Sequence, residues 1–222
     1  MTYRSRLRFL LEGLEGIVVF LLVSFTWPVS KRWLRDWGAR AEEREGAWPG
    51  DDLVEPPRTT LTRAIEIFAP SGTVWPWVAQ FGLGRAGFYS YELLERLVGI
   101  PVKNVESIAP ELQHPAVGDR IRLFPKVPGI PIAKLHVGRL VCFGELSEST
   151  DREAGPDPQR SWSIYIEPSS SDSCRLLIRG CTGTLRSPSL FKRLATRLEV
   201  PVDFVFEQRM LRTIKRLAEL RR

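Results

Sequence analysis

Two stretches in the second half of the chain alternate between apolar and polar residues, and this alternation limits the possible fold more than any other feature. They read "SWSIYIEP" from residue 161 and "SCRLLIRG" from residue 173. Glu167, Arg175 and Arg179 fall on one face. The other face carries six residues of apolar character: Trp162, Ile164, Ile166, Cys174, Leu176 and Ile178. A repeat of two residues with one apolar face predicts an antiparallel sheet with one buried and one solvent-exposed side.

The last segment of the chain has the periodicity of a helix. In "DFVFEQRMLRTIKRLAEL", one stripe holds Phe206, Met210, Ile214 and Leu217, and the basic residues lie mostly outside it. A helix over 203–220 would cover the apolar face of the sheet, which makes the fold class α+β with two packed layers. The same reading expects strands at 60–68, 119–125 and 132–146, and short helices at 72–82 and 89–99.

Gly82, Gly84 and Gly87 form a literal G-x-G-x-x-G. A dinucleotide site needs these glycines to leave a strand and open a helix, with an acidic residue on a second strand about 20 residues later. Here a helical stretch precedes them, and Glu106 lies in a proline-bounded loop. The glycines are therefore interpreted as a connection between two helices, and no dinucleotide is expected to bind.

Composition excludes several further classes of site. The three cysteines are an odd number without a C-x-x-C, and only two histidines are present, so neither a disulfide framework nor a metal site is expected. The chain lacks G-x-S-x-G, H-E-x-x-H and P-loop motifs. Its net charge of +6 is concentrated in residues 184–222, and no surface that interleaves basic residues with exposed aromatic ones is indicated, so no nucleic-acid partner is expected. No cofactor is expected either.

The N-terminal region has membrane character. Gly16 to Trp27 is uncharged, yet at about 1.5 Å per residue it reaches only about 18 Å of a ~30 Å hydrocarbon core. Extension back to Leu10 supplies the length but includes Glu12 and Glu15. Four interpretations stay open: a spanning anchor, a helix lying in the interface, a soluble packing helix and a signal peptide.

Basic residues and tryptophans flank this hydrophobic stretch. Lys31, Arg32, Arg35 and Arg40 slightly outnumber the basic residues at its N-terminal side, which favours a cytoplasmic main domain. The stretch "AEEREGAWPGDDLVEPPR" has no hydrophobic periodicity and is rich in Pro, Gly and acidic residues. The chain is therefore divided into a hydrophobic helix at 1–37, a linker or lead-in at 38–58 and one domain at 59–222.

Several segments in this order resemble the SRPBCC, or START-like helix-grip, superfamily, especially its bacterial polyketide cyclase/dehydratase-like branch. They include "APSGTVWPWVAQFG", "GFYSYELLERLVG", "IAPELQHPAVGDRI", "SWSIYIEP" and "FVFEQRMLRTIKRLAE", within residues 58–220. The resemblance implies a curved antiparallel sheet that wraps around a long C-terminal helix, with two short helices after the first strand. It also implies a cavity between sheet and helix for an apolar ligand.

Candidate ligand residues follow from this expected cavity and from the aromatic residues near its mouth. Arg85 could meet a ligand carboxylate or phosphate, although a solvated loop arginine is the plainer interpretation. No nucleophile-and-base pair is found, and His114 and His136 have no indicated catalytic role. The candidate cavity residues are Trp77, Phe81, Arg85, Phe88, Tyr89, Tyr91, Trp162, Ile164, Phe206, Met210 and Ile214.

Three functions are consistent with the sequence. The first is a membrane-tethered module that holds a lipid, isoprenoid or polyketide-like molecule in an internal cavity. The second is a cyclase/dehydratase-type enzyme in which Tyr and Arg groups polarise a carbonyl. The third is a structural or regulatory protein with a collapsed cavity. Without a catalytic motif, the first is the working hypothesis.

Overall fold

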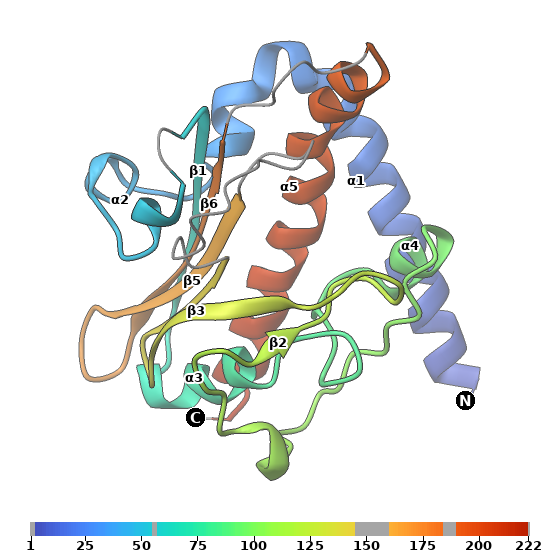
Figure 1. The fold of residues 1–222 in the computed structure, drawn as a ribbon. Helices are drawn as coiled ribbons and strands as arrows, with labels where there is room; N and C mark the ends of the chain where they lie inside the picture. Colours follow the sequence, from blue (N-terminus) through green and yellow to red (C-terminus); the bar gives the residue numbers. More distant parts are fainter. Residues whose placement is uncertain (1–2, 55–56, 145–159, 184–189, 222) are drawn as a thin grey trace.

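The structure is a computed structural model that describes residues 3–54, 57–144, 160–183 and 190–221 (Figure 1). Within these residues one antiparallel sheet has the strand order β1-β6-β5-β4-β3-β2. The stretch at 132–146 turns at Gly138, and its last two residues lie outside the described part. The strands are β1 (Thr59–Ile67), β2 (Arg120–Ile121), β3 (Ile130–His136), β4 (Leu140–Gly144), β5 (Arg160–Pro168) and β6 (Cys174–Thr182).

The concave face of the sheet is covered by the long helix α5 (Leu190–Glu219), as Figure 1 shows. Met210, Ile214 and Leu217 of α5 are buried in the main hydrophobic core. From the sheet the same core receives Ile164, Ile166, Cys174, Leu176 and Ile178, the face that alternation predicted. The helix-grip arrangement is thus confirmed, with α5 beginning before the expected residue 203.

The opposite, convex face of the sheet is not solvent-exposed, which corrects the expectation from alternation. Residues 36–54, including α2 (Ala41–Glu45) and the 3-10 turn η1 (Asp51–Leu53), pack across this face. Arg175 donates hydrogen bonds to both carboxylate oxygens of Glu43 (2.8 and 2.7 Å), and Arg179 does the same to Asp51 (2.6 and 2.8 Å). The polar positions of β6 therefore bind this lead-in segment rather than water.

Two short helices follow β1, namely α3 (Ser71–Ala79) and α4 (Glu92–Leu97), and a 3-10 turn η2 (Pro110–Leu112) follows them. Between α3 and α4, Gly82 and Gly87 exchange backbone hydrogen bonds of 3.0 and 3.1 Å. Gly82, Gly84 and Gly87 have φ values of 131, 77 and 87°, which side-chain-bearing residues rarely adopt. They close a tight turn between helices, in agreement with the sequence interpretation.

Helix α1 (Tyr3–Arg35) lies against α5 and α4 on the outside of the grip (Figure 1). Its inner face includes Gly13, Gly16, Val23 and Leu34, all buried against the domain. A Cβ on Gly13 would lie 2.2 Å from Leu93 Cδ2, so α1 and α4 are in very close contact. We define the outer face of α1 by six exposed residues: Leu10, Leu14, Val18, Leu21, Phe25 and Val29.

Candidate functional site

Four aromatic side chains form a group between the sheet and the turn after α3, and we call them the aromatic group: Phe81, Phe88, Phe143 and Trp162. The Phe81 ring lies 5.2 Å from Phe88, 6.4 Å from Phe143 and 5.3 Å from Trp162 between centroids. Phe143 of β4 stacks on Trp162 of the neighbouring strand β5 at 5.4 Å. Rings arranged in this way favour contact with another apolar or aromatic group.

A polar edge adjoins the aromatic group. The Trp162 indole donates to Glu207 Oε1 of α5 at 2.8 Å, and the other oxygen of Glu207 accepts from Arg63 of β1. Arg63 is fully buried, and its Nε also donates to the Leu34 carbonyl at 2.8 Å. Sequence analysis missed both charged residues. The alternation of β1 was the available signal, because it places Arg63 on the same face as Ile65 and Ile67.

Tyr89 is held in an unusual backbone conformation behind the aromatic group. Its φ is 58°, and Asn104 Oδ1 accepts from the Phe88 and Tyr89 amides at 3.0 and 2.7 Å. Its hydroxyl accepts from Gln80 Nε2 at 2.7 Å, and burial raises the pKa of this phenol. The Tyr89 hydroxyl is therefore neutral and already hydrogen-bonded within the protein. The two hydrogen bonds to Asn104 stabilise the strained backbone at Tyr89.

The structure brings most of the candidate cavity residues together. Trp162 packs at the margin of the main core. The core itself contains Trp77, Phe81, Phe88, Tyr89, Ile164, Met210 and Ile214. Whether they contact a ligand stays a prediction.

Three candidates lie elsewhere or have other partners. Arg85 donates to the carbonyls of Ala79, Phe81 and Leu112, at 3.0, 3.1 and 3.2 Å, so the guanidinium supports the loop. Tyr91 packs with α1 and α5 in a separate buried cluster, and Phe206 is only partly buried.

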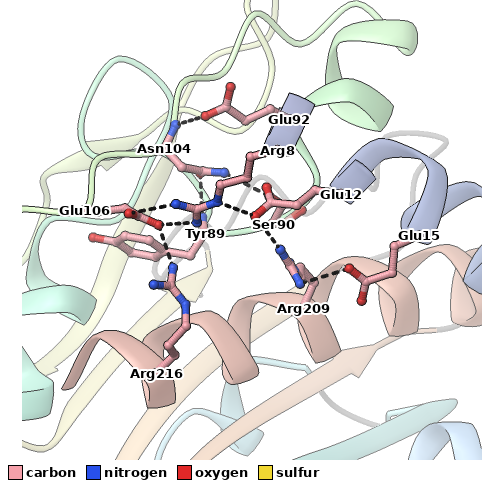
Figure 2. A network of polar contacts seen from close by, with 10 residues as sticks. All are labelled: Arg8, Glu12, Glu15, Tyr89, Ser90, Glu92, Asn104, Glu106, Arg209 and Arg216. Atoms are coloured by element: carbon pink, nitrogen blue, oxygen red, sulfur yellow. Dashed lines mark hydrogen bonds and ion pairs between the residues drawn. The ribbon is translucent and has the colours of Figure 1, made fainter. Parts of the chain in front are cut away.

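A cluster of charged residues joins α1 to the domain, and we call it the ionic cluster: Arg8, Glu12, Glu15, Glu106, Arg209 and Arg216 (Figure 2). Arg209 lies 3.0 Å from Glu12 and 3.3 Å from Glu15, measured between guanidinium nitrogens and carboxylate oxygens. Glu106 accepts from Arg8 at 2.6 Å and from Arg216 at 2.5 Å, and these hydrogen bonds lower its pKa to about 2. Carboxylates and guanidiniums from three parts of the chain thus neutralise one another.

The described residues show no metal-binding chemistry: none of their His, Cys, Asp and Glu side chains form a group of three or more that could hold an ion. Cys142, Cys174 and Cys181 are free and buried. Burial raises the pKa of the Cys174 thiol to about 11, so the reactive thiolate is disfavoured there.

Comparisons with known proteins give structural similarities only. No family model matches the chain, and no curated protein matches it. A Streptomyces aromatase/cyclase, Zhui, is 13% identical with a TM-score of 0.39 over 73% of this chain and 94% of its own. A polyketide-cyclase-like protein of Corynebacterium glutamicum is 14% identical with a TM-score of 0.40 over 73% and 92%. A Mesorhizobium loti protein is 14% identical with a TM-score of 0.40 over 71% and 98%. At this identity the similarity concerns the fold and assigns no activity.

Proposed function

We propose that this helix-grip protein is a membrane-associated module that holds an apolar small molecule between its sheet and α5. One observation carries the proposal: α1, with its apolar outer face, packs directly on α5, the helix that covers the concave face. A bilayer in contact with α1 would therefore be separated from the interior of the grip by the two packed helices α1 and α5. An apolar ligand from that bilayer would have a short path to the interior.

The aromatic group supports the apolar character of the ligand. Its four rings offer a continuous apolar wall, and Trp162 is only partly buried, so the wall reaches the protein surface at that ring. The hydrogen-bonded pair of Glu207 and Arg63 lies at its edge. A site of this kind suits a largely hydrocarbon or aromatic molecule, with at most a small polar group directed toward Glu207.

Helix α1 supports membrane association. Residues Arg6–Arg35 have the length and composition of a membrane span; their most apolar 18-residue window has a mean hydropathy of 2.0, and only 17% of that window is buried. A helix of a soluble core would be mostly buried. The main domain is proposed to lie on the cytoplasmic side, as the slight excess of basic residues at the C-terminal flank of the hydrophobic stretch favours.

The ligand is tested by recovering it from protein purified from the membranes of its own host. Solvent extracts analysed by mass spectrometry should contain one apolar compound in near-stoichiometric amount. Trp162→Ala should lose most of it, because the ring is part of the proposed wall. The matched control is Trp48→Ala, which removes the same side chain from the convex face, where the Trp48 ring packs at a tilt against Tyr165.

Recovery of only bulk membrane lipid, in equal amounts from parent, Trp162→Ala and Trp48→Ala proteins, would contradict the ligand proposal. If the purified protein converts the extracted compound into a different one on incubation, this result would instead favour the cyclase/dehydratase alternative.

A further inference from the structure

We infer that α1 binds the surface of an anionic bilayer lengthwise, with its outer face in the headgroup and upper acyl region, and does not cross the membrane. The inference rests on the proposed membrane association and specifies its geometry. The inference is based on the two faces of α1. Both faces carry apolar residues, but one packs on the domain and the other is exposed.

The inner face is fixed by close packing. A Cβ on Gly16 would come within 2.8 Å of Leu94 Cδ1 and 2.9 Å of Tyr91 Cγ, so the α1 backbone at Gly16 lies directly against the side chains of Leu94 and Tyr91. Val23 and Leu34 are buried in one cluster with Phe204 and Val205 of α5. This contact involves α4 and the part of α5 from Val200 to Arg209.

Polar contacts tie both ends of α1 to the domain. At the N-terminal end, the ionic cluster joins Glu12 and Glu15 to Arg209, and Arg8 to Glu106 (Figure 2). At the C-terminal end, the Leu34 carbonyl accepts from the fully buried Arg63 at 2.8 Å.

A membrane-spanning α1 would be incompatible with these contacts. It would have to carry α4 and the charged helix α5 into the hydrocarbon, or abandon every contact described above. Charged side chains are strongly disfavoured there. A helix lying in the surface keeps all of these contacts and still buries its exposed apolar residues.

The outer face fits a bilayer surface in length and charge. From Leu10 to Val29 it extends about 29 Å at ~1.5 Å per residue, so a helix that lies flat can place the whole face against the acyl region. Arg6 lies exposed at one end and Lys31 and Arg32 at the other, where they would meet anionic headgroups.

A second copy of this chain fits the outer face less well. Both ends of the face are basic, so parallel and antiparallel pairs alike would bring positive ends together. An anionic bilayer supplies the opposite charge at both ends at once.

The topology is tested with single-cysteine variants of the full-length protein, Arg6→Cys and Lys31→Cys, in membranes of the producing cells. The native cysteines are buried and give little background. A membrane-impermeant maleimide is applied to intact spheroplasts and to inside-out vesicles. We expect both positions to react in the same preparation. Labelling of the two positions in opposite preparations would overturn the surface geometry while leaving membrane association intact.

A second measurement uses purified protein and vesicles of phosphatidylcholine with phosphatidylglycerol. Phe25 is 87% exposed, so Phe25→Glu should fold normally and weaken vesicle binding at least about tenfold. The matched control is Val137→Glu, at a 68% exposed position in the β3–β4 turn, which should bind as the parent does.

Two results of the vesicle measurement would overturn the inference. One is unchanged binding by Phe25→Glu. The other is a dimer in light scattering that Phe25→Glu dissociates, which would assign the outer face to a second copy. Recovery of the parent protein in the soluble fraction of the cells would overturn the inference and the membrane part of the proposed function together, whereas the ligand part is judged separately by the Trp162 comparison.

Discussion

At the scale of single residues, the most unusual ionisable group is Glu95 of α4. Its Oε1 accepts from the Ser90 hydroxyl at 2.7 Å, and its Oε2 has no hydrogen-bond partner among the described residues. The residue is buried, and this burial raises the pKa of its carboxyl to about 7 from the ordinary 4.5. A folded state that prefers the neutral acid has a stability that depends on pH.

The sign follows from proton uptake. Between pH 4.5 and about 7 the folded chain binds more protons than the unfolded chain, so the stability from the neutral carboxyl is complete below pH 4.5 and is lost as the pH rises through 7. Glu95→Gln should remove this pH-dependent loss of stability, because the amide is neutral at every pH. From pH 5 to 8, the free energy of unfolding of the parent should fall by up to about 3 kcal/mol more than that of the variant. Urea titrations at several pH values measure it.

The control for this prediction is Glu111→Gln, which makes the same change in charge at an exposed position. If Glu95→Gln and Glu111→Gln show the same pH dependence as the parent, Glu95 is not held neutral by burial.

Single-residue roles were the least predictable part of the structure. Burial of Arg63 and Glu95 depends on neighbours far along the chain, such as Leu34 and Glu207 for Arg63, which a local pattern does not contain. Arg85 was placed near a ligand because of its glycine-rich turn, yet three backbone carbonyls accept its hydrogen bonds. Aromatic candidates on strands were easier to place, since strand alternation gives the face directly.

At the scale of elements, the contact between α1 and α5 depends on charge. Arg209→Glu would place a third carboxylate beside Glu12 and Glu15, so the first half of α1 should detach more often. Hydrogen–deuterium exchange over residues 6–20 should become faster. The control is Arg212→Glu, which reverses an exposed charge one turn further along, over the Trp37 ring, and should leave that region protected. Equal exchange in both variants would show that packing alone holds α1.

Strands β5 and β6 and the second half of α5 could be predicted because each has one apolar face in the main core, and apolar packing on one side imprints a period on the sequence. The faces of α1 could not, because its inner face packs on protein and its outer face is also apolar. Gly13 and Gly16 were the available signal, since adjacent glycines on one side of a helix permit close approach of another helix.

At the scale of the whole molecule, the lead-in at 36–54 is a structural layer rather than a tether. A chain that begins at Pro49 lacks Glu43 and leaves the buried Arg175 with only the longer ion pair to Glu66 at 3.7 Å, whereas a chain that begins at Asp36 retains the hydrogen-bonded pair with Glu43. Both lack α1, so they form a matched comparison. The shorter chain should be less stable by about 3–5 kcal/mol in urea unfolding. Equal stability would mean that the lead-in contributes little to the fold.

The packing of α1 on α5 also has a consequence for biosynthesis. The two helices are separated by most of the chain, and at about 5–20 residues per second α5 is completed roughly 10 to 40 s after α1 leaves the ribosome tunnel. During that interval Val23, Leu34 and the acidic residues Glu12 and Glu15 lack the α5 partners on which they will later pack. A nascent chain in this state exposes the uncharged stretch from Gly16 to Trp27 on the side that α5 later covers, and it does so until synthesis is nearly finished.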